Sequence, residues 1–271
     1  MCNLLAVINW QSFGIVVAIL AVLAIIFTVL IIVVGKVCAV DENPKIGEVA
    51  ENLSGANCGG CGYAGCADFA KALVEGRAEV NECASTPKEN KAKIGVILGK
   101  EVVDTEPMIA VVKCAGDTDS AIKKFKYIGN PYCEAKNAYF AGDKKCVDGC
   151  LGGGSCFNRC SFGAITIVNG VAVTNKALCI GCGACVKGCA KQVIELIPKT
   201  AVIYVACSSH CKGKDVIASC KAGCIGCGLC AKNCPNGAIT MVDNLPVIDY
   251  SKCNGCLTCV AKCPKKVIKE L

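Results

Sequence analysis

The chain has 271 residues and a mass of 28.0 kDa, and 27 of its residues are cysteine. This is about a tenth of the chain, far above the usage of globular proteins. A secreted disulfide scaffold is excluded because such scaffolds are short and lack the tight C-x-x-C-x-x-C runs found here, so we expect thiolate metal sites. The formal charge of +7 counts every cysteine as neutral. Six thiolate-bound 4Fe-4S clusters at roughly −2 each would turn it into about −5, so the charge indicates no nucleic-acid partner.

Residues 13–34 form an uninterrupted apolar segment without a single charge. As a helix it would be ~33 Å long, which is enough to span a bilayer. A cleaved signal peptide would need a basic segment in front of the apolar one, and none is present. The nearby positive charges, Lys36 and Lys45, follow the segment, so the positive-inside rule predicts a single-pass anchor with its amino terminus outside and the bulk of the chain in the reducing cytoplasm.

The next segment carries a compact group of cysteines among glycines, with the spacing C-x2-C-x4-C-x16-C. Its members are Cys58, Cys61, Cys66 and Cys83. Four thiolates suit one 4Fe-4S cluster, and the glycines let the backbone fold tightly around inorganic sulfur. A zinc site would more often show two C-x2-4-C pairs separated by a longer loop. We therefore predict an iron–sulfur module with a short helix over residues 67–76.

An internal duplication fills the rest of the chain: an offset of 74 residues superposes residues 133–194 on 207–268 without a gap. The second copy contains two C-x2-C-x2-C-x3-C runs, the spacing of bacterial two-cluster ferredoxins, in which the fourth cysteine of each run ligates the other cluster. The predicted ligands are Cys224, Cys227, Cys230 and Cys263 for one cluster, and Cys253, Cys256, Cys259 and Cys234 for its neighbour. Short strands are expected at residues 238–242 and 246–248.

The first copy departs from this pattern at one position, where Gly153 stands in place of Cys227. One predicted cluster is complete, with Cys160, Cys179, Cys182 and Cys185. The other has Cys150, Cys156 and Cys189 and lacks one ligand. Cys114, Cys133 and Cys146 all lie upstream, and we favour Cys146 as the substitute because it is nearest in the sequence.

The remaining cysteines allow a sixth cluster between the two copies. If Cys146 serves the incomplete site, Cys114, Cys133, Cys207 and Cys220 are left for it. The symmetry of the repeat equally permits Cys133, Cys146, Cys207 and Cys220, with Cys114 completing the other site. Free buried thiols are the third reading, since cysteine packs well as a small apolar residue. The sequence therefore predicts five or six 4Fe-4S clusters.

The order of anchor, CGGCG module and tandem ferredoxin units resembles the B subunit of the Rnf complex, a membrane-bound ferredoxin:NAD oxidoreductase of bacteria that translocates ions. LSGANCGGCGYAGC and CLGGGSC are the most specific segments. The resemblance implies a protein in the bacterial cell membrane that accepts electrons from soluble reduced ferredoxin and passes them to other membrane subunits. Flavins, nicotinamide and the ion pathway would belong to those partners, and the sequence agrees, because it has no dinucleotide fingerprint and no charge inside the span.

The expected fold class is α+β. The predicted domains are an anchor helix (1–36), a small helical 4Fe-4S module (37–100) and two ferredoxin-like units (101–200 and 201–271). Two other functions fit parts of the pattern. One is a polyferredoxin subunit of another membrane redox complex, such as one that reduces a redox-sensing transcription factor, and the other is a zinc-binding interaction protein.

Overall fold

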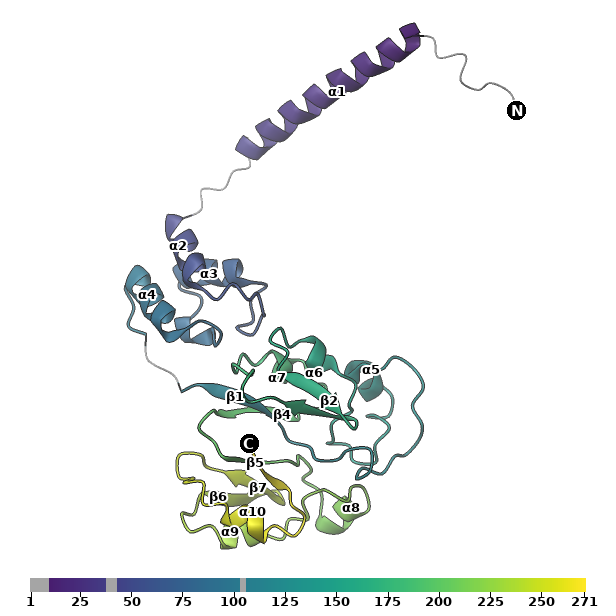
Figure 1. Cartoon of the computed structure of the whole chain (residues 1–271), viewed down its shortest axis with the longest axis vertical. Coiled ribbons are helices and arrows are strands. Elements are labelled where there is room, and N and C mark those ends of the chain that lie inside the picture. Colours follow the sequence, from purple (N-terminus) through teal and green to yellow (C-terminus); the bar gives the residue numbers. More distant parts are fainter. Residues whose placement is uncertain (1–9, 38–42, 103–105) are drawn as a thin grey trace, which may run out of the picture. The chain divides into compact units, whose positions relative to one another are not determined.

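The computed structural model describes residues 10–37, 43–102 and 106–271. The chain divides into two compact units, Met1–Pro44 and Lys45–Leu271. Figure 1 shows the long helix α1 in the first unit, and helices with short strands in the second.

The first unit contains one long helix, α1 (Trp10–Val37). Its segment Phe13–Val34 is long and apolar enough to cross a membrane. The side chains of this segment are exposed, so they have no protein core to cover them. The one hydroxyl among them is satisfied inside the helix, because Thr28 Oγ1 donates to the Ala24 carbonyl oxygen over 2.7 Å. A helix whose polar groups are all paired internally suits the hydrocarbon interior of a bilayer.

The second unit begins with a small helical module. It contains α2 (Pro44–Asn52), α3 (Cys66–Val74), the 3-10 helix η1 (Val80–Glu82) and α4 (Lys88–Leu98). Phe69, Leu73 and Ile94 are almost fully buried and pack with Val49 into a core of its own. The predicted helix over residues 67–76 is present, and it begins at Cys66. Because α3 starts at a cysteine, the module's core fixes the position of that thiol.

The rest of the unit contains four antiparallel two-stranded sheets. The pairs are β1 (Met108–Val112) with β4 (Ile194–Pro198), β2 (Ile165–Val168) with β3 (Val171–Thr174), β5 (Ile203–Val205) with β8 (Ile268–Glu270), and β6 (Ile239–Val242) with β7 (Leu245–Ile248). The helices between them are short: α5 (Cys133–Ala138), α6 (Ser155–Asn158), α7 (Ala184–Lys187), α8 (Gly213–Ile217), α9 (Leu229–Lys232) and α10 (Thr258–Lys262). Two apolar cores contain cysteines among their members. The first is built on Ile109, Ile165 and Ile197, and the second on Ile203, Val267 and Ile268.

The duplication seen in the sequence recurs in the structure. The hairpin β2–β3 and the hairpin β6–β7 begin 74 positions apart, as do α6 and α9. The repeat is longer than the ungapped match, because β1 and β5 also correspond: Val112 pairs with Ile194, and Val205 pairs with Ile268. We refer to residues 106–201 as the first repeat and to residues 202–271 as the second.

This register changes one predicted correspondence between cysteines. Two residues beyond Val112 stands Cys114, and two residues beyond Val205 stands Cys207, so the counterpart of Cys207 is Cys114 and not Cys133. Cys114 and Cys146 are 32 positions apart, whereas Cys207 and Cys220 are 13 apart, so the first repeat has 19 extra residues here. A bridge between Lys123 and Lys144 closes the base of this insertion, which contains Cys133.

Candidate metal centres

The four predicted cysteines of the helical module surround one cavity. Cys58, Cys61, Cys66 and Cys83 all line it, and Cys182 of the first repeat lines it as well. Burial alone would raise the pKa of Cys83, but hydrogen bonds from the hydroxyls and backbone amides of Ser85 and Thr86 together outweigh it and lower the pKa. The thiolate that a metal requires is therefore favoured at this position.

Cys133 lies at the incomplete site of the first repeat. The cavity at this site is lined by Cys133, Cys150, Cys156 and Cys189, and Cys146 is not among its lining residues. Burial raises the pKa of Cys156 to about 12, and the neighbouring Cys150, Cys133 and Cys189 add to the rise. The structure thus departs from our preference for Cys146, which rested on distance along the chain alone.

The insertion explains why Cys133 lies at this cavity. A Cβ at Gly153 would stand 2.3 Å from the Pro131 carbonyl oxygen and 2.7 Å from the Cys133 nitrogen. No side chain fits there, because the inserted segment occupies the space that a cysteine at position 153 would need. The Ser155 hydroxyl accepts a hydrogen bond from the Cys133 backbone N–H over 3.0 Å, which fixes the start of α5 at this cavity. The inserted loop excludes one thiol and provides another.

The second predicted group of the first repeat also comes together. Burial raises the pKa of Cys185 to about 12, and Cys182, Cys179 and Cys160 contribute as charged neighbours. Backbone amides point at two of the sulfurs: Ala110 N donates to Cys179 Sγ and Ala164 N to Cys160 Sγ, each over 3.3 Å. Amide donors of this kind stabilise thiolates and tune clusters bound to them.

The second repeat shows a matching arrangement. Cys224, Cys227, Cys230 and Cys263 line one cavity. Cys253 and Cys256 both act on the pKa of Cys259, which burial raises. Cys234 accepts a hydrogen bond from Ala238 N over 3.3 Å, as its counterpart Cys160 does from Ala164. That Cys234 belongs to the group with Cys253, Cys256 and Cys259 is a prediction from the repeat.

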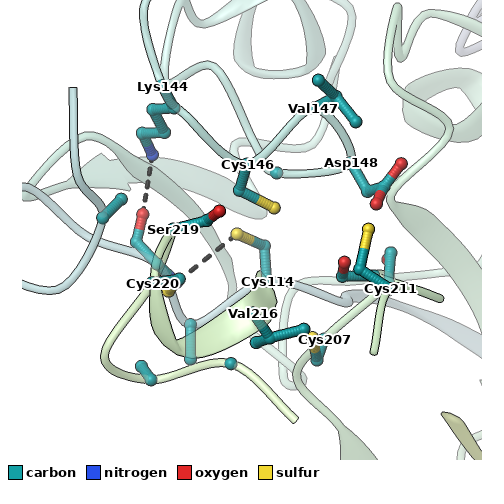
Figure 2. A pocket seen from close by; sticks show the side chains of 18 of the residues that line it. Cys114, Lys144, Cys146, Val147, Asp148, Cys207, Cys211, Val216, Ser219 and Cys220 are labelled. Atoms are coloured by element: carbon teal, nitrogen blue, oxygen red, sulfur yellow. Dashed lines mark hydrogen bonds between the residues drawn. The ribbon is translucent and has the colours of Figure 1, made fainter. Parts of the chain in front are cut away.

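A further cavity lies between the repeats, where Figure 2 shows sulfur atoms from both. It has a volume of about 80 Å³. Its lining includes Cys114, Cys146, Cys207, Cys211 and Cys220. Of the residues that we considered for a sixth cluster, the structure brings Cys114, Cys207 and Cys220 together here with Cys146, and it places Cys133 at the other site.

These groupings fit clusters better than single ions. Among the residues that the structure describes, no three metal-ligating side chains come close enough together to share one ion. Their sulfurs instead surround cavities, as a cubane with its ligands outside four irons requires. The donors are thiols throughout, and many are buried. The one histidine, His210, is exposed and hydrogen-bonds to the Asp243 carbonyl oxygen, so it has no place in these groups.

Comparison with known proteins agrees with this chemistry. The Fe-S cluster family matches residues 53–85, which contain the four cysteines of the helical module. The 4Fe-4S dicluster domain family matches residues 223–267, which contain both cysteine runs of the second repeat. The chain therefore contains iron–sulfur domains at both places.

Three relatives match nearly the whole chain. The B subunit of an ion-translocating oxidoreductase complex of Methanosarcina acetivorans is 42% identical over 93% of this chain and 96% of its own length. The B subunit of a Na⁺-translocating ferredoxin:NAD⁺ oxidoreductase complex of Acetobacterium woodii is 37% identical over 93% and 76%. A proton-translocating counterpart of Clostridium ljungdahlii is 39% identical over 93% and 90%. With this extent of identity, the chain belongs to the family of B subunits of Rnf-type ion-translocating oxidoreductase complexes, as the order of its cysteine motifs predicted.

Proposed function

We propose that this protein accepts electrons from reduced ferredoxin at its second repeat and relays them through 4Fe-4S clusters to membrane partners in the same complex. That it is an iron–sulfur electron-transfer subunit follows from its family and its iron–sulfur domains. Two of the relatives are named as parts of ferredoxin:NAD⁺ oxidoreductases, which supports ferredoxin as the donor. One observation, the exposure of Cys256, supports the point of input.

Cys256 and Cys182 occupy equivalent positions in the two repeats, 74 residues apart. Cys182 lies against Gly60 of the helical module and lines the same cavity as the module's cysteines. Cys256 is exposed. In the first repeat, the helical module therefore covers the cluster at Cys182. In the second repeat, the equivalent cluster is open at Cys256 to an external redox partner.

The surface of the second repeat is basic. Lys252, Lys262, Lys266 and Lys269 are exposed, and Lys265 is half-buried and lines the cavity of Cys224, Cys227, Cys230 and Cys263. One carboxylate offsets part of this charge, because Lys252 Nζ lies 3.1 Å from Asp249 Oδ2. Ferredoxins are typically acidic, so a surface of this sign would speed their encounter in a salt-dependent way.

The groups described above define the ligands that we assign to five clusters. Each repeat is a two-cluster ferredoxin-like unit, with its fourth cysteines crossing over. The first repeat uses Cys133, Cys150, Cys156 and Cys189 for one cluster and Cys160, Cys179, Cys182 and Cys185 for the other. The module uses Cys58, Cys61, Cys66 and Cys83 for its cluster. The second repeat uses Cys224, Cys227, Cys230 and Cys263 for one cluster and Cys234, Cys253, Cys256 and Cys259 for the other.

The helical module is the point of electron output. Its predicted boundaries are residues 37–100, directly after the anchor, and the two units behind it are residues 101–200 and 201–271. Family membership and the apolar helix α1 support association with the membrane. In our proposal the anchor crosses the lipid bilayer once, with its amino terminus outside and all clusters in the cytoplasm.

A charge-removal variant tests the input site. Replacing Lys262, Lys265, Lys266 and Lys269 with Gln should slow reduction by ferredoxin several-fold at low ionic strength and flatten its salt dependence. Iron content and reduction by dithionite should stay the same. Replacing four lysines of the module, Lys45, Lys71, Lys88 and Lys93, provides a control with the same change of charge. If both variants keep the parental rate and salt slope, ferredoxin docks elsewhere.

A further inference from the structure

Five cysteines line the cavity between the repeats, and the five clusters assigned above use none of them. We propose that four of these, Cys114, Cys146, Cys207 and Cys220, bind a sixth 4Fe-4S cluster that carries electrons from one repeat to the other. This rests on the proposed electron-transfer function. The cluster would take up one electron from a cluster of the second repeat and be reoxidised when it passes that electron to the first.

The four thiols line one cavity, and we refer to them as the ring. Cys114 follows β1 and Cys207 follows β5. Cys146 follows the Lys123–Lys144 bridge, and Cys220 forms a bridge with Ala121. A Cβ at Gly116 would lie 3.2 Å from Cys220 Sγ and 3.6 Å from Cys114 Sγ, so glycine leaves room among the sulfurs. The structure therefore holds the four thiols around one shared space.

The ring is symmetric with respect to the repeats. Cys114 corresponds to Cys207 by strand register, and Cys146 corresponds to Cys220 by the 74-residue offset. The two repeats are also joined directly at Cys220 by an antiparallel bridge to Ala121, in which Ile122 N donates to Ser219 O over 3.0 Å and Lys221 N donates to Ser120 O over 2.8 Å. Each repeat thus contributes an equivalent pair of thiols to one site, and neither repeat could form the site alone.

Amide donors connect this ring to a neighbouring cluster on each side. Cys150 N donates to Cys114 Sγ over 3.3 Å, and Cys224 N donates to Cys207 Sγ over 3.4 Å. Cys150 and Cys224 are themselves assigned as ligands of one cluster in each repeat. A cluster in the ring would therefore have one hydrogen-bonded connection to a cluster of each repeat. It would join the two clusters of the first repeat and the two clusters of the second into one chain for electron transfer.

A buried cation provides an independent indication that the ring is anionic. Lys144 is 4% exposed, and its Nζ donates to the Gly116 and Gly170 carbonyl oxygens over 2.7 and 3.1 Å. In the described part of the chain, it forms no ion pair with a carboxylate; the adjacent Asp143 pairs with Lys123 instead. Lys144 lines the same cavity as the four thiols. A buried ammonium is costly without negative charge nearby, and a thiolate cluster would provide it.

The fifth cysteine of the cavity, Cys211, stays outside the ring. It is exposed, whereas Cys207 and Cys220 are buried and Cys114 and Cys146 are half-buried. Figure 2 shows its sulfur beside the Asp148 carboxylate. Cys211 therefore provides a matched control, because it is a thiol in the same cavity that is not needed for the cluster.

Metal analysis of the anaerobically purified full chain tests the proposal. Six clusters give about 24 irons per chain and five give about 20. We expect about 24 with no zinc, a loss of about four in Cys207→Ala, and no loss in Cys211→Ala. The wild-type count alone decides the matter if Cys207→Ala fails to fold.

Three results separate the possible failures. About 20 irons in the wild type, unchanged in Cys207→Ala, would mean that the ring consists of free thiols. About 20 irons and one zinc would mean that it holds a zinc ion. Both results overturn the sixth cluster and leave the proposed function intact, whereas a wild type without iron, or one that ferredoxin does not reduce, overturns the proposed function itself.

Discussion

The backbone of Gly60 lies directly against Cys182. A Cβ at Gly60 would stand 2.4 Å from the Cys182 carbonyl oxygen and 3.0 Å from its Cβ, so glycine is required by the closeness of the two segments. Beside this contact, Lys187 Nζ donates to the Gly60 carbonyl oxygen over 2.7 Å. Gly60 precedes the assigned ligand Cys61, and Cys182 is itself an assigned ligand. The contact therefore brings the module's cluster and the nearest cluster of the first repeat together.

Gly60→Ala should slow electron transfer between the module and the first repeat, because the added methyl group forces the two segments apart. Rapid-mixing spectroscopy should show the module's cluster reduced several-fold more slowly, with unchanged iron content. Gly47→Ala is the control, since no atom lies within 4 Å of a Cβ at that position. Equal rates in the two variants would show that the contact does not set the rate.

Cys133 and Cys146 should belong to different clusters. Replacement of either with Ser should remove about four irons, and the double variant about eight, because two separate sites lose a ligand each. Iron analysis of the three variants is sufficient. If each single variant loses four and the double variant also loses only four, both residues belong to one site, in conflict with the cavities that we describe; no loss in Cys146→Ser would instead mean that Cys146 binds no cluster.

Lys144→Met should lower the reduction potential of the sixth cluster, which we propose for the ring. Reduction adds negative charge, and the buried ammonium stabilises it by about 2 kcal/mol at an effective dielectric of about 20, or roughly 90 mV for one electron. An EPR-monitored redox titration measures this shift. Lys145→Met removes the same charge from an exposed neighbour, where water screens it, and should change the potential little. Equal potentials in both variants and the wild type would remove the role given to Lys144.

Deletion of residues 1–36 should yield a soluble brown protein that ferredoxin still reduces but that no longer passes electrons on in membranes. All assigned ligands lie between Cys58 and Cys263, within the unit Lys45–Leu271. Absorption spectra and membrane-linked reduction assays check the two parts. Failure of the truncated chain to assemble clusters, even after anaerobic reconstitution, would reveal a folding role for the anchor.

The sequence by itself determined the features that follow from local spacing. Twenty-two apolar residues require a long apolar helix. The cysteine motifs, together with their order along the chain, identified iron–sulfur chemistry and the family. These conclusions hold without coordinates because a C-x2-C-x2-C spacing places thiols around one cluster through the local backbone alone.

The tertiary structure decided which distant thiols come together. The ungapped repeat paired Cys133 with Cys207, but strand register pairs Cys207 with Cys114, because the first repeat contains an insertion that the offset does not show. The same insertion fills the space at Gly153 and places Cys133 at that site. The ring of Cys114, Cys146, Cys207 and Cys220 depends on how two repeats pack against each other, and no spacing within either one specifies that contact.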